Sequence, residues 1–324
     1  MLIAVTGASG FVGGHVLRAA AAAGVEAVAV VRSPSSAGRV SVTPSARAVQ
    51  ARLRAEELAP AFAGAGAVVH LAHIGSERAG RTYRDVNVEG TRQVMEGAQA
   101  AGVPRVVMFS GLGVARYGLA PRVTNPYFRS KREAEEIVFA AGLEAVVFRP
   151  SYVLGAGEGL VPSLLEQMRE GTVELPGDGA YRMQPAAVED AAAAILAAAG
   201  IHSEPPIRGL EAEPGFFPGR TPHRVFDLVG PEPLSVRDFV SRVGEAARAL
   251  GEGREFTVRS VPLAEADRAA AAGGWHGMPP DELDCLLCDE VSDPAPLQAL
   301  LGRPLTPVAV ALDRALRSAL GQEG

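Results

Sequence analysis

Tyr127 and Lys131 are the two residues whose types and spacing best suit proton transfer. They are four positions apart, so both side chains lie on one face if the segment is helical. A phenol that exchanges protons near neutral pH needs its pKa lowered, and an ammonium group beside it has that effect. A hydroxyl that orients a substrate could come from Ser110, directly after the apolar run 105–109, or from Thr124. The pair alone also fits a solvated helix face, so its meaning depends on the elements around it.

A glycine-rich turn near the start of the sequence provides that context. The apolar run 2–5 is typical of a buried parallel strand, and the helix-forming run 15–23 follows the turn. Gly7 allows a sharp turn, Gly10 lets the backbone approach a diphosphate, and Gly13 lets the helix lie against the strand. The first amides of that helix would face the phosphates. We therefore expect a dinucleotide here, with a turn that binds nothing as the alternative. The residues expected to contact it are Gly7, Ser9, Gly10, Phe11, Val12 and Gly13.

Arg32 directly follows the second predicted strand, 26–31. An acidic residue at this position would bind the ribose hydroxyls of NAD, whereas an arginine suits the 2′-phosphate of NADP. Ser33, Ser36 or Arg39 could assist it. The sequence thus favours NADP as the cofactor, with NAD as the alternative; a solvated arginine at a strand end would be the purely structural interpretation.

The order of apolar runs predicts an α/β fold with a doubly wound parallel (Rossmann) sheet. Six predicted strands alternate with helices in residues 1–150, whereas 33–43 is predicted to be a Ser/Pro/Gly loop. Beyond Pro150 the rhythm changes, which indicates a smaller, mainly C-terminal α+β substrate domain. The nucleotide-binding domain is expected at 1–150, with returning segments at about 182–200 and 223–230. The smaller domain is expected at 151–181, 201–222 and 231–324.

Composition and charge argue against several classes of partner. The formal net charge is −6 with both signs spread along the chain, so neither nucleic acid nor an anionic membrane is expected as a partner. The longest apolar run, 191–201, is too short to span a bilayer, so no integral membrane segment is expected. Leu2 already belongs to the first strand, which leaves no room for a signal peptide. Cys285 and Cys288 allow no disulfide framework, have no second ligand pair for a metal, and fit a cytoplasmic protein.

Seven pieces of the sequence, in order, resemble the extended and atypical short-chain dehydrogenase/reductases. They are TGASGFVG at 6–13, HLA at 70–72, NVEGT at 87–91, YFRSK at 127–131, RPSYVLGAG at 149–157, QPAAVEDAAAAI at 184–195 and FDLVGPEPLS at 226–235. The stretch 283–307 is most similar to atypical members related to the NADPH-binding accessory subunit of respiratory complex I. The resemblance covers nearly the whole chain.

This resemblance implies roles for individual residues. Tyr127 would be the acid/base, and Lys131 would tune its pKa and hold the cofactor ribose. Asn87 would match the asparagine that the family carries in a helix. The residues that would border the cofactor near the strand ends are Leu71, Ala72, His73, Arg149 and Pro150; His73 could instead be a core or edge histidine.

Two departures from the family pattern matter. Extended members usually carry a Ser or Thr one or two places beyond the first serine after the fifth strand, where this sequence has Gly111 and Leu112. Ser110 is therefore either catalytic or structural, and Thr124 could supply the hydroxyl instead. In addition, Arg52 follows the third strand near a position where many relatives carry an Asp that meets the adenine.

Two functional hypotheses follow. The first is an NADP-dependent oxidoreductase or epimerase/dehydratase-like enzyme that transfers a hydride at a carbonyl or alcohol carbon of an unidentified small molecule. The second is an NADP(H)-binding protein with little or no catalysis, acting as a redox sensor or as an accessory or assembly partner of a respiratory complex. The intact pair Tyr127 and Lys131 favours the first, while the residues after Ser110 favour the second. Either a homodimer or a respiratory-complex-like assembly fits the chain.

Overall fold

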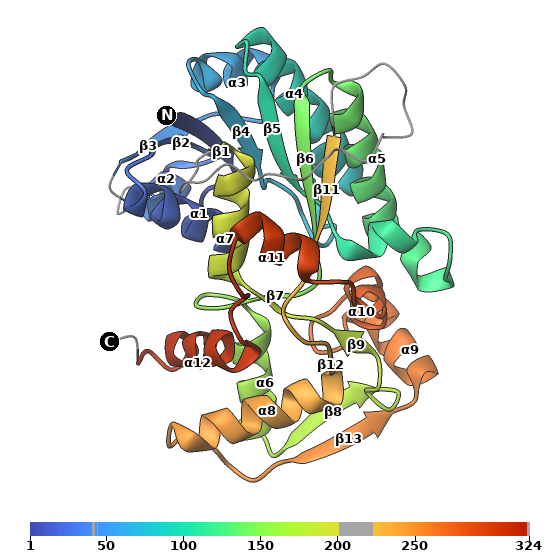
Figure 1. Cartoon of the computed structure of the whole chain (residues 1–324). Coiled ribbons are helices and arrows are strands. Elements are labelled where there is room, and N and C mark those ends of the chain that lie inside the picture. The colour runs from blue at the N-terminus through green and yellow to red at the C-terminus, as the bar shows by residue number, and fades with distance from the viewer. Residues whose placement is uncertain (41–42, 44, 201–222, 323–324) are drawn as a thin grey trace.

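The protein is built on a seven-stranded sheet in which every neighbouring pair of strands runs parallel (Figure 1). The computed structural model describes residues 1–40, 43, 45–200 and 223–322, so the predicted segment 201–222 lies outside the described residues. The strands, in spatial order, are β11 (His223–Leu228), β6 (Glu144–Pro150), β5 (Arg105–Phe109), β4 (Ala67–His70), β1 (Leu2–Thr6), β2 (Glu26–Val31) and β3 (Ala46–Gln50). All six strands predicted before residue 150 are present, which confirms the doubly wound fold.

The strand order determines where a ligand can bind. From β1 the chain moves outward to β2 and β3, then returns to place β4 on the other side of β1. At such a reversal, the connections after the two central strands leave in opposite directions and open a crevice at the carboxyl ends of the strands. The glycine-rich turn follows β1, so it lies at this crevice.

Helices cover both faces of the sheet (Figure 1). On one face lie α1 (Phe11–Ala22), α7 (Val188–Ala198) and α11 (Ala295–Leu301). On the other lie α3 (Ala55–Phe62), α4 (Gly90–Ala100) and α5 (Pro126–Ala140). The start of α5 is encoded locally: Asn125 Oδ1 accepts a hydrogen bond from the Phe128 amide at 2.9 Å, and Pro126 occupies the first helical position.

The predicted loop 33–43 was wrong in part, because it contains the helix α2 (Pro34–Val40). Pro34 has a backbone angle already suited to the first turn of a helix, and Ser33 Oγ accepts a hydrogen bond from the Ser36 amide at 3.3 Å. These two local features outweigh the Ser/Pro/Gly composition. As a result, the chain after Arg32 is ordered along the edge of the crevice.

A second group of elements packs around its own buried apolar cluster below the sheet (Figure 1). Its helices are α6 (Leu160–Arg169), α8 (Val236–Ala249), α9 (Leu263–Gly273), α10 (Pro280–Leu286) and α12 (Val308–Ala319). Its strands are β7 (Val153–Leu154), β8 (Thr172–Pro176), β9 (Arg182–Met183), β10 (Ala186–Ala187), β12 (Leu234–Ser235) and β13 (Thr257–Val261). Two short 3-10 helices, η2 (Leu112–Arg116) and η3 (Pro121–Thr124), and a π-helical turn, η1 (Arg84–Glu89), complete the fold.

This group agrees with a smaller α+β unit, but its bounds remain a prediction. The sequence analysis overlooked β8 and β13, which pair with each other in parallel. It also placed 231–324 entirely in the smaller domain, whereas Leu297 and Leu300 of α11 are buried in the same cluster as the strands of the main sheet. The last part of the chain therefore returns to the sheet before α12.

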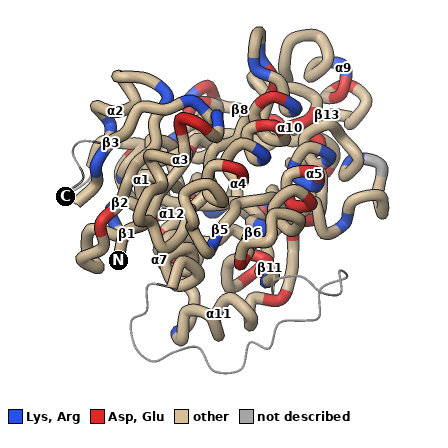
Figure 2. The backbone as a smooth tube through the Cα atoms, turned by 90° about the horizontal axis from the view of Figure 1, so that it is seen from above, with Lys and Arg blue, Asp and Glu red and all other residues tan. Residues whose placement is uncertain are grey.

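Basic and acidic residues are spread along the backbone of the described part of the chain, as Figure 2 shows. No helix within the described residues combines the length and apolar character needed to cross a membrane.

Candidate active site

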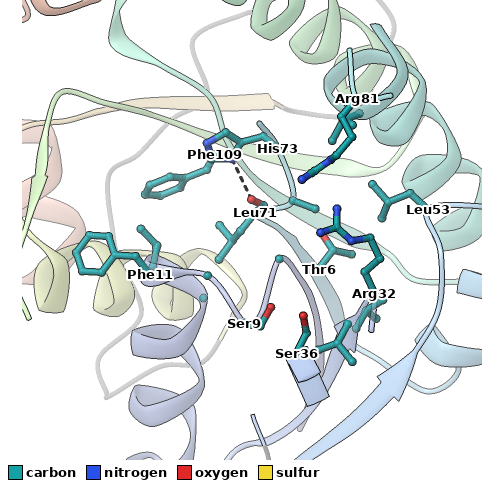
Figure 3. Close-up of a pocket in the computed structure, with 18 of the residues that line it drawn as sticks. Thr6, Ser9, Phe11, Arg32, Ser36, Leu53, Leu71, His73, Arg81 and Phe109 are labelled. Carbon is teal, nitrogen blue, oxygen red and sulfur yellow. Dashed lines mark hydrogen bonds between the residues drawn. The ribbon is translucent and has the colours of Figure 1, made fainter. Parts of the chain in front are cut away.

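A cavity of about 890 Å³ opens at the carboxyl ends of the central strands (Figure 3). This volume is in the range of cofactor and ligand pockets. Most of the predicted cofactor residues line it: Gly7, Ser9, Gly10, Phe11, Val12, Gly13, Arg32, Leu71, Ala72, His73 and Pro150. Two of the four predicted catalytic residues, Ser110 and Tyr127, line the same cavity. The sheet thus brings the glycine-rich turn and the proposed chemistry to one space.

The glycine-rich turn is shaped so closely that side chains would not fit. Gly7 has φ +71°, and a Cβ placed there would lie 2.7 Å from backbone atoms of Leu71 and Ala72. A Cβ on Gly13 would lie 2.4 Å from the Gly7 carbonyl oxygen. Gly10 is the N-cap of α1 and offers no capping side chain, so within the described residues the first amides of this helix stay available to an anion. This donor set fits the diphosphate of a dinucleotide.

One end of the cavity is basic. Arg32, at the end of β2, lines it together with Arg39, Arg52 and Arg81. The buried Ser36 accepts a hydrogen bond from Arg39 at 3.2 Å, while Arg52 is ion-paired with Glu57. Sequence analysis named Arg32, Ser36 and Arg39 as candidates and missed Arg81, which lies far along the chain in the loop after β4.

The other end holds the two hydroxyls expected to act on a substrate. Ser110 is 3% exposed, and its Oγ has no hydrogen-bond partner among the described residues. A buried hydroxyl without a partner is costly unless a ligand completes it. Tyr127, on the first turn of α5, lines the cavity beside it. Both residues therefore border the same space.

Thr124, the alternative source of a hydroxyl, does not line the cavity. It is exposed at the end of η3, while its neighbour Asn125 is the residue that turns inward to cap α5. The 3-10 turn therefore directs Thr124 to the surface. Of the two predicted hydroxyl sources, only Ser110 reaches the site.

Three further predicted residues lie behind the cavity wall. Asn87 is buried and uses its amide to bind the backbone of Ile74 (2.8 and 3.1 Å) and Ser130 Oγ (3.0 Å). Arg149 forms an ion pair of 2.6 Å with Glu135, which joins β6 to α5. Lys131 is the third of these residues. Asn87 and Arg149 thus hold the elements that carry the site and do not line the cavity.

Lys131 is 1% exposed, and its Nζ donates a hydrogen bond to the Phe109 carbonyl oxygen at 2.9 Å. Nζ lies 6.0 Å from the centre of the Tyr127 ring. Burial lowers the pKa of Lys131 to about 7, with the charge of Glu135 acting in the opposite direction. Its charge also lowers the pKa of His73, whose Nδ1 lies 3.0 Å from the Leu71 carbonyl oxygen (Figure 3).

The phenol of Tyr127 is not activated by the chain alone. Burial raises its pKa, and the Cys285 thiol and the carboxyl groups of Glu290 and Glu282, once ionised, add to that shift. This is the direction opposite to the one predicted from its spacing to Lys131. The physical reason is that burial disfavours the phenolate, and Lys131, whose Nζ donates to the Phe109 carbonyl oxygen, does not offset it.

Glu290 is a residue that the sequence analysis missed. Its amide donates to the Arg182 carbonyl oxygen at 2.8 Å, and its carboxyl group hydrogen-bonds with Ser151, next to Pro150 of the cavity wall. Arg116 holds the backbone on both sides through the carbonyl oxygens of Asp289 and Val291. Burial raises the pKa of Glu290 to about 8, against smaller opposing effects of Ser151 and Arg116. No periodicity marks such a residue, because its place depends on contacts from distant segments.

Comparison with known proteins agrees with this geometry. The family model described as the NAD dependent epimerase/dehydratase family matches residues 3–206. A 4-hydroxy-2-methyl-3-oxo-4-farnesyl-3,4-dihydroquinoline-1-oxide ketoreductase from Stigmatella aurantiaca is 28% identical over 295 residues, which cover 85% of this chain and 81% of that protein. A 2-alkyl-3-oxoalkanoate reductase from Stenotrophomonas maltophilia is 32% identical over 212 residues, covering 60% of this chain and 64% of that protein.

Solved structures and a respiratory protein extend the comparison. UDP-glucuronic acid 4-epimerase from Bacillus cereus, solved with UDP-glucuronic acid and NAD, superposes with a TM-score of 0.73 at 17% identity over 100% of both chains. The mitochondrial NADH dehydrogenase (ubiquinone) 1 alpha subcomplex subunit 9 from Arabidopsis thaliana is 26% identical over 206 residues, 62% of this chain and 49% of that protein. The predicted resemblance is therefore confirmed. The chain belongs to the NAD dependent epimerase/dehydratase family and is an enzyme of its nucleotide-dependent oxidoreductase, epimerase or dehydratase type.

Proposed function

We propose that the protein is an NADP-dependent reductase that acts on a ketone of an uncharged, lipophilic small molecule. The observation that carries this proposal is the meeting of Ser110 and Tyr127 in the cavity that begins at the glycine-rich turn. The Ser110 hydroxyl lacks a partner among the described residues, which supports contact with a substrate oxygen.

The roles of the residues follow from their positions. When bound, a reduced nicotinamide would supply a hydride for the carbonyl carbon. Tyr127 gives a proton to the carbonyl oxygen, and Ser110 holds that oxygen by a hydrogen bond. Lys131 lies beneath the ring, with Nζ 6.0 Å from its centre, and its protonated form would favour the phenolate that results, as would the positive charge of an oxidised nicotinamide. Arg32, which directly follows β2 and carries no ion pair within the described residues, is the basis for NADP over NAD.

The proposed substrate class rests on how the arginines next to the catalytic end are engaged. Arg116 donates to the carbonyl oxygens of Asp289 and Val291. Arg122 forms ion pairs with Asp267 and Asp284 at 3.0 and 2.6 Å. A nucleotide-sugar diphosphate would need free cations, so these pairings favour an uncharged substrate. The reductase from Stigmatella aurantiaca is named for a farnesyl quinoline oxide, which is uncharged and lipophilic and agrees with this class. The reductase from Stenotrophomonas maltophilia is named for an alkyl oxoalkanoate, which shares the ketone and the alkyl chain but carries a carboxylate.

The test is NADPH oxidation by the full chain with a panel of lipophilic ketones, using Tyr127→Phe and, as a matched control, Tyr117→Phe in the loop after η2. We expect Tyr127→Phe to lower kcat by about 10²- to 10⁴-fold with unchanged NADPH affinity, since it removes the proton donor alone. Tyr117→Phe should retain turnover. Equal turnover in the wild type and Tyr127→Phe would overturn the proposed role of Tyr127.

A second candidate function is an NADP(H)-binding accessory protein with little turnover, in a homodimer or a respiratory-complex-like assembly. It is supported by the match to the Arabidopsis subunit and by Gly111 and Leu112, which stand where a second hydroxyl is usual in extended relatives. Tight NADPH binding without turnover on any ketone would favour it. A cytoplasmic location fits either function, since Cys285 and Cys288 are free thiols.

A further inference from the structure

Two arginines from distant segments converge at the basic end of the cavity. Arg32 directly follows β2, and Arg81 lies in the loop between β4 and η1. Figure 3 shows their guanidinium groups turned toward each other, with Leu53 and Ser36 nearby. The two side chains therefore border the same part of the cavity from opposite sides.

This pair of cations has no counterion in the described part of the chain. Neither Arg32 nor Arg81 forms an ion pair there, in contrast to Arg52 with Glu57. Asp85 also lines the cavity, where its carboxylate accepts a hydrogen bond from Thr82 Oγ1 at 2.7 Å and forms no ion pair with either arginine. Burial and the charges of Arg32 and Arg78 lower the pKa of Arg81. An anion between the two guanidinium groups would replace repulsion by two attractive contacts.

The loop that carries Arg81 is fixed before any ligand binds. The backbones of Arg78 and Arg81 exchange two hydrogen bonds, of 3.2 and 2.9 Å, across a turn in which Gly80 has φ +74°. On one side of the turn, the Tyr83 amide donates to Glu77 Oε1 at 2.7 Å, and the Tyr83 hydroxyl donates to the Gly75 carbonyl oxygen at 2.8 Å. The position of Arg81 is thus part of the folded structure.

We propose that Arg81 is a second ligand of the cofactor 2′-phosphate, closing on it from the side opposite Arg32. Selection of NADP then depends on a two-arginine clamp and not on the arginine after β2 alone. The inference rests on the proposed preference for NADP. The diphosphate of the cofactor is a second anion that Arg81 could contact, and the measurement below separates the two.

The experiment measures dissociation constants of the full chain for NADPH and NADH by nicotinamide fluorescence, and for 2′,5′-ADP and ADP by calorimetry. The variants are Arg81→Ala, Arg81→Lys, Arg32→Ala and the double variant. Arg78→Ala is the matched control, because Arg78 lies in the same turn and does not line the cavity. We expect Arg81→Ala to weaken NADPH and 2′,5′-ADP about tenfold or more and to leave NADH and ADP unchanged.

The other variants test whether Arg32 and Arg81 contact one phosphate group. Arg81→Lys keeps the charge but not the two-pronged geometry, so it should lie between the wild type and Arg81→Ala. The double variant should lose less than the sum of the single losses, since both residues would contact one group. Equal weakening of NADPH and NADH by Arg81→Ala would assign Arg81 to the diphosphate and overturn the proposal, as would no weakening at all. A wild type that prefers NADH would instead refute the NADP preference itself, whatever the variants do.

Discussion

Arginines at the two ends of the cleft differ in whether they have partners within the chain. At the basic end, Arg32 and Arg81 face the cavity without a carboxylate partner among the described residues. At the catalytic end, Arg116 and Arg122 are held by carbonyl oxygens and carboxylates of the smaller unit. Glu290, which lies at this end, has its pKa raised to about 8 by burial and is largely uncharged at neutral pH. Among the described residues, Arg32 and Arg81 at the basic end of the cavity are thus without an ion-pair partner, whereas the arginines near the catalytic end are engaged by the chain itself.

The number of arginines near a site therefore says little about what the site binds. An arginine becomes an anion ligand when the fold leaves it unpaired, and it becomes a structural tie when the fold supplies partners. At the catalytic end, the partners of Arg122 lie 145 and 162 positions away in the sequence.

Gly13→Ala should disrupt cofactor binding at the glycine-rich turn. The added methyl group would lie 2.4 Å from the Gly7 carbonyl oxygen, so the turn and the start of α1 would have to separate. We expect NADPH affinity to fall by about a hundredfold or more and stability to fall by about 1–3 kcal/mol. These are measured by fluorescence titration and denaturant unfolding.

The neighbouring Gly14 is the matched control for this prediction. A methyl group there meets only an atom of the flexible Arg18 side chain, at 3.6 Å. Gly14→Ala should therefore retain NADPH binding and gain up to about 1 kcal/mol from helix propensity. Similar NADPH loss in both variants would show that the close approach at Gly13 is not what matters.

Ser110→Ala should lower turnover at the catalytic end of the cavity. It removes a buried hydroxyl that has no partner among the described residues, so folding stability should change little while kcat falls about 10- to 100-fold. Thr124→Ala is the control, because Thr124 is exposed and does not line the cavity. A larger kinetic loss for Thr124→Ala than for Ser110→Ala would reverse the assignment.

How far the sequence predicted this protein depends on whether a feature is local. The strands, the turn at Gly7 and the pairing of Tyr127 with Lys131 on one helix follow from neighbouring residues and from spacing, and the fold was predicted correctly. The helix α2 was missed, because its start depends on Ser33 and Pro34 and not on apolar periodicity.

Features that depend on distant contacts could not be predicted. Arg81 lines the cavity, and Glu290 meets Arg182 and Ser151, only because segments that are distant in the sequence pack together. Thr124 and Ser110 both looked suitable in sequence, and only the 3-10 turn before α5 separates them. Arg149 matched a family motif near the nicotinamide, yet its guanidinium group is engaged by Glu135.

Glu290→Gln tests whether the neutrality of the catalytic end depends on a protonated carboxyl group. The folded chain holds this proton more tightly than the unfolded chain, since the pKa is about 8 against an ordinary value of 4.5. The stability of the wild type should therefore fall as the pH rises from about 4.5 to 8 and level off above that range. The variant, which cannot ionise, should lose less stability over the same range.

The measurement is the melting temperature between pH 4.5 and 9, with Glu265→Gln on the exposed side of α9 as control. An ionised Glu290 would also disfavour negative charge on the Tyr127 phenol, so the variant should retain activity to higher pH than the wild type. Parallel stability curves for the wild type and Glu290→Gln would contradict the protonated state of Glu290.

The smallest expected effect concerns the neutralisation of Arg122. Its two terminal nitrogens contact both oxygens of Asp267, at 3.1 and 3.0 Å, and one of them also contacts Asp284 at 2.6 Å. The group is partly exposed to water, so replacing both partners, Asp267→Asn with Asp284→Asn, should cost only about 1 kcal/mol of unfolding free energy.

The double variant also tests whether the pairing of Arg122 affects the preference for an uncharged substrate. A released Arg122 adds a cation near the catalytic end, so a ketone that carries a carboxylate should gain in kcat/KM relative to its uncharged methyl ester. Asp313→Asn, which breaks an exposed pair with Arg317 four residues away, is the control and should change neither quantity measurably. If the double variant shows the same preference between acid and ester as the wild type, the paired arginines are structural ties only, and the choice of an uncharged substrate must come from the apolar wall of the cleft.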